Sequence, residues 1–305
     1  MAKLGRKVKG GQKLSSGSVE VVVDAGATIG EGPVWDAREN VVWWVDITRN
    51  LVHRYDPDSR RDTTIDVGQA VGAVVPRASG GLVLAVQDGF AVLDPDTRRL
   101  DLIAPVEEDT PENRMNDAKC DSSGRLWGGT MAYSEAAGAG RFYRLDTDHS
   151  VVKILDDVTC SNGIGWSPED RQMYYIDSGA QQVDVFDYER ATGEVRNRRK
   201  LIDIPAEAGV PDGMAVDAQG YIWVALWGGA AIRRFAPDGT LDRVVEIPAK
   251  QVTSCVFAGR DLTDLYITSA CEGLTESEIR AYPHSGALFL HHPAVAGQPT
   301  NTYGG

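Results

Sequence analysis

Short apolar stretches separated by turn residues run along almost the whole chain. The clearest example is residues 211–225, where Met214 and Val216 lie on one face, a turn ends at Gly220, and a second apolar run follows. Apolar runs of this length, bounded by residues that favour turns, are typical of antiparallel β-strands. Helical periodicity is not sustained anywhere, so residues 133–139 and 274–278 are expected to be loops. The pattern predicts an all-β protein.

The strand–turn–strand unit recurs six times. The first inner-strand residues of the units stand at positions 31, 71, 116, 162, 212 and 253, which are 40, 45, 46, 50 and 41 residues apart. Repeats of this length with four strands are typical of propeller blades. The sixth unit is one strand short, and the apolar run 19–23 can supply it. We predict a six-bladed β-propeller with four antiparallel strands per blade, closed by an N-terminal strand in the last blade.

The ends of the chain differ from the repeats. Residues 1–18 carry five basic and no acidic side chains and are rich in Gly and Ser, without the apolar segment of a secretory signal peptide. This composition indicates a disordered basic leader or a vector-derived remnant. Residues 19–305 are expected to form a single propeller domain.

Composition narrows the classes of partner. The 305 residues include 31 Lys+Arg and 44 Asp+Glu, a net charge of −13, so nucleic acid is not expected as a partner. No apolar run approaches the roughly 18 residues of a membrane span. The four cysteines are widely spaced, and with no export signal they indicate free thiols in a cytoplasmic protein. The sequence does not fix the oligomeric state.

The residues that begin the six units carry the candidate chemistry. In a propeller, the innermost strands all start at one end of the central channel, so these residues converge. Four positions offer carboxylate or amide oxygens: Glu31, Asn116, Asn162 and Asp212. Such a ring suits a hard divalent cation, and without one the carboxylates would repel each other. Turn chemistry explains one Asn-Gly or Asp-Gly pair, but recurrence at equivalent positions of four blades favours a site.

Several ordered motifs resemble the regucalcin/gluconolactonase family, the senescence-marker-protein-like sugar lactonases. They span about residues 20–285: Gly30-Glu31-Gly32-Pro33-Val34-Trp35, Asn113-Arg114-Met115-Asn116-Asp117, Gly129-Thr130-Met131, Ser161-Asn162-Gly163, Tyr174-Tyr175-Ile176-Asp177-Ser178, Pro211-Asp212-Gly213-Met214 and Thr253-Ser254-Cys255. The resemblance implies a six-bladed propeller with one divalent cation, Ca²⁺ being favoured over Zn²⁺, Mn²⁺ or Fe²⁺. It also implies hydrolysis of small-molecule sugar lactones to aldonic acids.

Residue by residue, the resemblance implies that Glu31, Asn162 and Asp212 bind the metal and that Arg114 and Asn116 face the substrate. Asp212 would also be the general base that accepts a proton from the attacking water. The cation would polarise the lactone carbonyl or lower the pKa of a bound water.

Two further acidic residues, Asp117 and Glu135, have less direct evidence for their predicted roles. Asp117 is expected to support the metal ligands from behind them or to cap the strand turn. Several family members follow Gly-Thr-Met-Ala with two acidic residues, one of which contacts substrate. Here Tyr133 and Ser134 occupy these positions, and Glu135 comes one residue later. Glu135 is therefore the candidate substrate-binding acid, and the sugar preference stays open.

Two other functions fit the same residues. The cation site could hydrolyse organophosphates or other esters, because a cation also polarises a phosphoryl oxygen, or the propeller could bind metal for regulation without turnover. No G-x-S-x-G, H-E-x-x-H, Walker or G-x-G-x-x-G motif is present. The five histidines fall away from the strand starts. The tryptophans are expected to pack between blades, with Trp227 as the candidate for sugar stacking.

Overall fold

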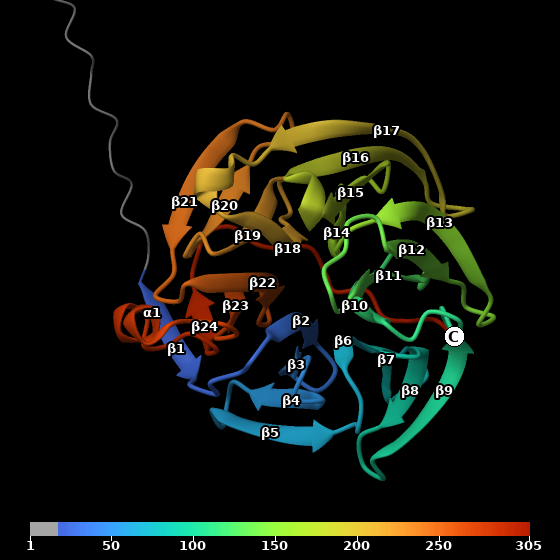
Figure 1. The fold of residues 1–305 in the computed structure, drawn as a ribbon, viewed down its shortest axis with the longest axis horizontal. Helices are drawn as coiled ribbons and strands as arrows, with labels where there is room; N and C mark the ends of the chain where they lie inside the picture. The colour runs from blue at the N-terminus through green and yellow to red at the C-terminus, as the bar shows by residue number, and fades with distance from the viewer. Residues whose placement is uncertain (1–17) are drawn as a thin grey trace, which may run out of the picture.

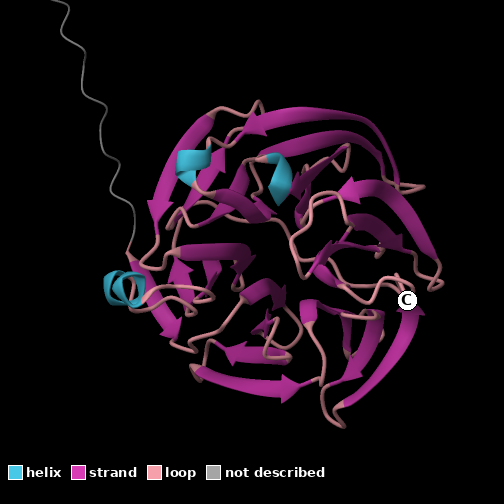
Figure 2. Cartoon of the chain, viewed as in Figure 1, coloured by secondary structure: helices cyan, strands magenta, loops and turns pink. Residues whose placement is uncertain are grey.

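In the described part of the chain, twenty-four strands form six four-stranded antiparallel sheets arranged in a ring (Figures 1 and 2). The computed structural model describes residues 18–305, so the predicted basic leader lies outside the described residues except for its last position. Each sheet is one blade, and in five of the six blades the strands follow one another outward from the centre of the ring in chain order. The predicted six-bladed propeller is confirmed.

The blades have the following strands, given from the innermost outward. The first three blades are β2 (Gly30–Asp36), β3 (Val41–Asp46), β4 (Leu51–Asp56), β5 (Arg61–Asp66); β6 (Val71–Pro76), β7 (Leu82–Val86), β8 (Gly89–Asp94), β9 (Arg99–Pro105); and β10 (Asn113–Cys120), β11 (Leu126–Ala132), β12 (Gly140–Leu145), β13 (Val151–Val158). The next two are β14 (Ser161–Trp166), β15 (Gln172–Asp177), β16 (Gln182–Glu189), β17 (Glu194–Asp203); and β18 (Val210–Val216), β19 (Ile222–Trp227), β20 (Ala231–Phe235), β21 (Leu241–Glu246).

The sixth blade joins the two ends of the described chain. It consists of β22 (Gln251–Ala258), β23 (Asp264–Ala270), β24 (Leu288–His291) and, outermost, β1 (Val19–Val23). Strand β1 runs antiparallel to β24, with Val19 opposite His291 and Val21 opposite Phe289. The predicted closure by an N-terminal strand is confirmed, and it leaves the ring without an open seam.

Burial follows the distance of a strand from the centre. Inner and middle strands such as β3, β7 and β11 are buried along their whole length, whereas the outer strand β17 is mostly exposed. The tryptophans predicted to pack between blades are buried: Trp35, Trp43, Trp127 and Trp223. In two blades the indole N–H donates at 2.9 Å to an aspartate at the end of the inner strand, from Trp127 to Asp121 and from Trp223 to Asp217.

One local prediction is wrong. Part of the expected loop 274–278 belongs to a short helix, α1 (Glu276–Ala281). Thr275 accepts a hydrogen bond from the Glu278 backbone, and the Glu278 carboxylate accepts one from the Thr275 backbone at 2.9 Å. This capping box satisfies the first backbone groups of a helix too short to show a periodic pattern. Residues 133–139 form a loop as expected, and two 3₁₀ turns cover Ser178–Ala180 and Ala206–Ala208.

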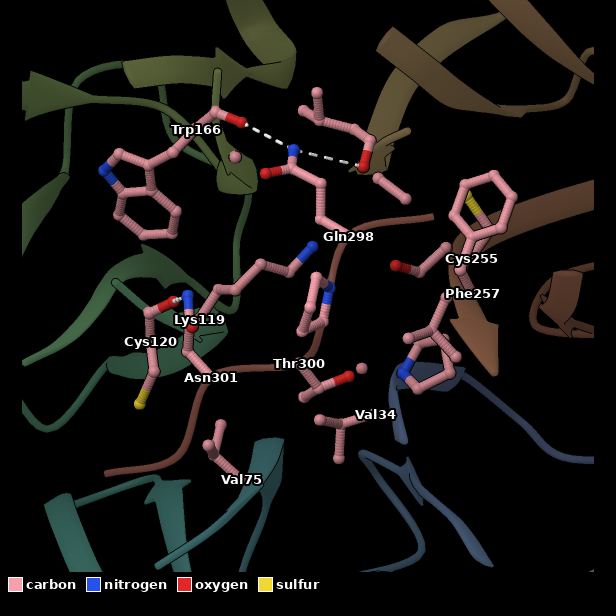
Figure 3. Close-up of a pocket in the computed structure, with 18 of the residues that line it drawn as sticks. Val34, Val75, Lys119, Cys120, Trp166, Cys255, Phe257, Gln298, Thr300 and Asn301 are labelled. Atoms are coloured by element: carbon pink, nitrogen blue, oxygen red, sulfur yellow. Dashed lines mark hydrogen bonds between the residues drawn. The ribbon is translucent and has the colours of Figure 1, made fainter. Parts of the chain in front are cut away.

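Residues 293–305 cross the ring at the end opposite the strand starts, which we call the back end. Gly297 donates a backbone hydrogen bond to Leu262 of the sixth blade, Ala218 of the fifth donates to Ala296, and Gly304 donates to Gly124 of the third. The Gln298 amide reaches the carbonyl of Trp166 in the fourth blade (Figure 3). The segment therefore ties several blades together and closes one end of the channel.

Candidate metal centre and active site

A cavity of about 370 Å³ lies at the front end of the channel, where the inner strands begin. Its lining includes six of the seven residues singled out from the sequence: Glu31, Arg114, Asn116, Glu135, Asn162 and Asp212. The seventh, Asp117, lines a separate cavity toward the back end. Residues up to 181 positions apart in sequence thus meet in one place, although their roles stay predictions.

Breaks in strand pairing aim these side chains into the channel. The regular register of the inner strand is interrupted between Glu31 and Val34 in β2 and between Met115 and Ala118 in β10. The same interruption follows Ser161 in β14 and Pro211 in β18. Such bulges bend a strand and redirect its side chains, and they are common beside functional sites.

Glycines let neighbouring inner strands approach each other at these breaks. A Cβ on Gly72 would lie 2.2 Å from the carbonyl oxygen of Asn116, and one on Gly163 would lie 2.8 Å from that of Asp212. Both contacts are with backbone atoms that cannot move aside locally. The glycines are therefore needed to hold the candidate ligands close together.

Three carboxyl groups are buried in this part of the channel, Glu31 and Asp212 in the wall of the front cavity and Asp117 in the wall of the back cavity. Glu31, Asp117 and Asp212 are each 6% exposed or less. Burial raises the pKa of all three carboxyls, and repulsion from Asp117 raises the pKa of Glu31 and of Asp212 further. Because the charged forms are desolvated and repel each other, a positive charge among them would stabilise the cluster.

The oxygen donors of this cluster fit a hard cation. The Asn162 amide nitrogen donates to the Ser178 hydroxyl at 3.0 Å, and this hydroxyl donates to the Pro211 carbonyl at 2.7 Å. The Asn162 Oδ1 atom is buried without a hydrogen-bond partner. No group of three or more His, Cys, Asp or Glu side chains within residues 18–305 is arranged to hold a metal ion. A metal site here therefore requires the free amide oxygen of Asn162 beside Glu31 and Asp212.

Arg114 and Asn116 form a separate pair at the side of the cavity. Arg114 Nη1 donates to Asn116 Oδ1 at 2.6 Å and to the Met115 carbonyl at 3.1 Å. The Asn116 amide nitrogen donates to the Ser161 carbonyl at 2.8 Å. Because its oxygen is already engaged by Arg114, Asn116 is a weaker metal ligand than Asn162. The substrate-facing role of Asn116 stays a prediction.

The family model described as the SMP-30/gluconolactonase/LRE-like region matches residues 29–271. The chain belongs to this family. Regucalcin from Xenopus laevis is 39% identical over 282 residues, which cover 90% of this chain and 94% of that protein. A Bacillus subtilis (strain 168) protein, provisionally named a sugar lactone lactonase, is 38% identical over 267 residues, covering 87% and 91% of the two chains. The solved structure of a calcium-binding regucalcin from Agrobacterium tumefaciens is similar, with a TM-score of 0.91, 31% identity and coverage of 94% and 97%.

The front cavity also has lining residues that the sequence did not single out as site residues. Glu272 follows β23, and Ser178 follows β15. Partial burial raises the pKa of the Glu272 carboxyl, and the charge of Arg114 opposes that shift. Trp227, the candidate for sugar stacking, ends β19 and lines the cavity as well. The second strand of a blade runs antiparallel to the first, so the residues that follow it lie at the front end, where the first strand starts. Applied to the sequence, this rule would have identified Ser178 and Glu272.

Two further observations concern the histidines and the helices. None of the five histidines lines the front cavity. None of the helices in residues 18–305 is long and apolar enough to cross a lipid bilayer.

Proposed function

We propose that this protein is a divalent-cation-dependent hydrolase that opens aldono-1,4- or 1,5-lactones to aldonic acids. The observation that carries this proposal is the buried cluster of Glu31, Asn162 and Asp212 beside the Arg114–Asn116 pair in one cavity. Membership of a family that includes gluconolactonases supports it.

Glu31, Asn162 and Asp212 would hold the cation through two carboxylates and one amide oxygen. Oxygen ligands of this kind favour Ca²⁺, with Zn²⁺, Mn²⁺ or Fe²⁺ as alternatives. A solved relative is described as calcium-binding, which agrees with this choice. When bound, the cation would supply a positive charge that polarises the lactone carbonyl.

Asp212 is the candidate general base. Without a cation, burial and the neighbouring Asp117 hold the pKa of its carboxyl well above the usual range. A bound cation would lower that pKa and keep the carboxylate ionised, the form that accepts a proton. It would accept a proton from the attacking water and later return it to the ring oxygen that leaves as a hydroxyl. Its place in the wall of the cavity, beside Asn162, lets it act on a water at the substrate.

The remaining cavity residues would bind and orient a neutral, polyhydroxylated ring. Arg114 uses Nη1 to hold Asn116, which leaves its other guanidinium N–H groups for a sugar oxygen or the developing oxyanion. The carboxylates of Glu135 and Glu272 would accept hydrogen bonds from sugar hydroxyls, and Trp227 offers an apolar face. A cavity of about 370 Å³ is large enough for one monosaccharide lactone.

A phosphotriesterase or other esterase activity on the same residues is the alternative within enzymes, and a non-catalytic metal-binding propeller is the alternative outside them. The Glu135 and Glu272 acceptors favour a hydroxylated substrate over an aryl phosphotriester. The Arg114–Asn116 donors favour turnover over binding alone, because a cation site does not need them.

The test is to assay purified, Ca²⁺-loaded protein by pH-stat titration against a panel of aldonolactones and a neutral phosphotriester. We expect hydrolysis of at least one aldonolactone with a kcat/KM at least about tenfold above that of the phosphotriester. A faster phosphotriester reaction would support the esterase. No hydrolysis across the panel, with Zn²⁺, Mn²⁺ and Fe²⁺ also tried, would support the binding propeller.

A further inference from the structure

A lysine side chain enters the channel from behind the candidate metal ligands. Lys119 lies on β10, three residues after Asn116, and lines the back cavity of about 270 Å³ together with Asp117. In Figure 3 its side chain extends from the β10 side into the middle of this cavity, below Gln298. The C-terminal residues 298–301 line the same cavity.

The Lys119 ammonium is held in place without a direct carboxylate contact. Its Nζ atom donates to the Met214 carbonyl of β18 at 2.6 Å. Within residues 18–305, none of the ion pairs closer than 4.0 Å includes Lys119. Its charge still acts on the carboxyls of Glu31 and Asp117. Asp117 is 4% exposed and its Oδ2 atom has no hydrogen-bond partner, so neither charge is neutralised by a contact partner.

Four charged side chains lie among and behind the candidate cation ligands, apart from the substrate side. Ionised Glu31, Asp117 and Asp212 contribute three negative charges, and Lys119 contributes one positive charge. The sum of minus two equals the charge of one divalent cation with opposite sign. Arg114 lies on the substrate side, where it binds Asn116 and interacts with the charges of both Glu272 and Glu31, so it adds a further positive charge that the count of these four residues leaves out.

We propose that Lys119, balanced by Asp117, sets the valence selectivity of the cation site, so that the channel prefers a divalent to a trivalent ion. This inference rests on the cation site of the proposed function. It adds a role for two residues that would touch neither the substrate nor the reacting water. Lys119 and Asp117 act through the electrostatic potential at Glu31, Asn162 and Asp212.

The effect of each charge on selectivity has a definite sign. The electrostatic part of the binding free energy is the ion's charge multiplied by the local potential, so a trivalent ion feels any change in potential half again as strongly as a divalent ion. Removing Lys119 makes the potential more negative and favours the trivalent ion. Removing the charge of Asp117 does the opposite, and removing both restores the balance.

The experiment measures the ratio of the Ca²⁺ and La³⁺ dissociation constants by titration calorimetry on metal-free protein. We expect Lys119→Met to shift this ratio roughly tenfold toward La³⁺ and Asp117→Asn to shift it by a similar factor toward Ca²⁺. The double variant should return to the wild-type ratio, and Lys119→Arg, which keeps the charge, should stay close to it.

Two controls isolate the channel site. Lys153→Met removes a half-exposed lysine on β13 and should leave the ratio unchanged. Asp212→Asn identifies which binding event belongs to the channel, because other acidic surfaces also bind lanthanides.

Each outcome decides the inference. An unchanged ratio in folded Lys119→Met, or a Lys119→Arg that behaves like Lys119→Met, would overturn the charge role while leaving the cation site intact. If Lys119→Met does not fold, an unchanged ratio in Asp117→Asn overturns it equally. A wild type that binds neither ion would overturn the cation site and the inference together, and a wild type that binds Ca²⁺ but hydrolyses no lactone leaves the inference testable by the same ratios.

Discussion

The front and back ends of the channel are built from the same six inner strands and differ in how their polar groups are treated. At the front end, strand pairing is interrupted beside Glu31, Asn116, Asn162 and Asp212, and a cavity of about 370 Å³ remains. At the back end, residues 293–305 cross the strand turns and hydrogen-bond to them. The front end keeps the buried Asn162 amide oxygen without a partner, whereas at the back end the C-terminal segment hydrogen-bonds to the backbone of the turns.

This difference separates the residues that stabilise the fold from those expected to bind the cation and the substrate. The front end gathers desolvated carboxyls whose mutual repulsion opposes folding in the absence of a cation. The back end contributes hydrogen bonds and closure. Proteins tolerate such local cost mainly at functional sites, where the rest of the fold compensates for it. Substitutions at the two ends should therefore have opposite signatures.

The largest effect is expected for Asp212→Asn at the front end. Loss of the candidate base and of a cation ligand should lower kcat for lactone hydrolysis by about 10³-fold or more. The metal-free variant should nevertheless unfold at a higher temperature than the wild type, because a buried carboxylate that repels its neighbours is replaced by a neutral amide. Lactonase assays and thermal unfolding measure the two effects.

The matched control is Asp203→Asn, which changes an exposed carboxylate at the end of β17. It should leave kcat unchanged and shift stability by no more than about 0.5 kcal/mol. If Asp212→Asn kept the wild-type kcat, the front end would not differ from the back end in its contribution to catalysis.

Gly72→Ala should disturb the front end through the backbone. The added Cβ would lie 2.2 Å from the Asn116 carbonyl oxygen, so the inner strands of the second and third blades must separate. We expect a loss of about 3 kcal/mol in the free energy of unfolding and weaker substrate binding through a displaced Asn116.

Gly228→Ala provides the comparison, because a Cβ there meets no atom within 4 Å although φ is +75°. Its cost should be about 1 kcal/mol from the left-handed backbone alone. Urea unfolding of both variants checks this order, and equal losses would show that close strand approach does not matter at Gly72.

Stability of the metal-free protein should decrease as pH rises from the ordinary carboxyl range toward neutrality. Glu31, Asp117 and Asp212 have raised pKa values in the folded state, so the folded protein binds more protons than the unfolded chain and loses stability as those protons dissociate. Each unit of pKa shift corresponds to about 1.4 kcal/mol.

Urea unfolding between about pH 5 and about pH 8 measures this slope, which is set by proton binding. The slope should be smaller in Asp212→Asn, which lacks one of the three groups. If the unfolding free energies of the wild type and Asp212→Asn changed equally with pH, the Asp212 carboxyl would bind no more protons in the folded protein than in the unfolded chain.

The smallest effect is expected at the back end. Gln298→Ala removes hydrogen bonds to the carbonyls of Trp166 and Val216. We expect a loss of about 1 kcal/mol in the free energy of unfolding and an unchanged kcat. A change in kcat of more than about twofold would show that the back end takes part in the chemistry.

The sequence predicts the regular parts of this molecule because its repeats carry the same strand and turn signals six times. The closing strand Val19–Val23 and the meeting of Glu31 with Asp212 follow from ring geometry alone. The inward position of Lys119 could not be predicted, since a lysine in a strand is ordinarily exposed and only the ring turns this one toward the channel. The path of residues 293–305 could not be predicted from the sequence either, because Pro- and Gly-rich segments carry no periodic pattern and their positions depend on tertiary contacts.

The most direct test of the central claim is lactone hydrolysis measured before chelation, in excess chelator, and after a divalent cation is restored in excess of the chelator. If Glu31, Asn162 and Asp212 hold a cation required for catalysis, hydrolysis should fall to the uncatalysed rate and return when Ca²⁺ or another suitable divalent ion is added. Hydrolysis at the full initial rate in excess chelator would contradict the claim.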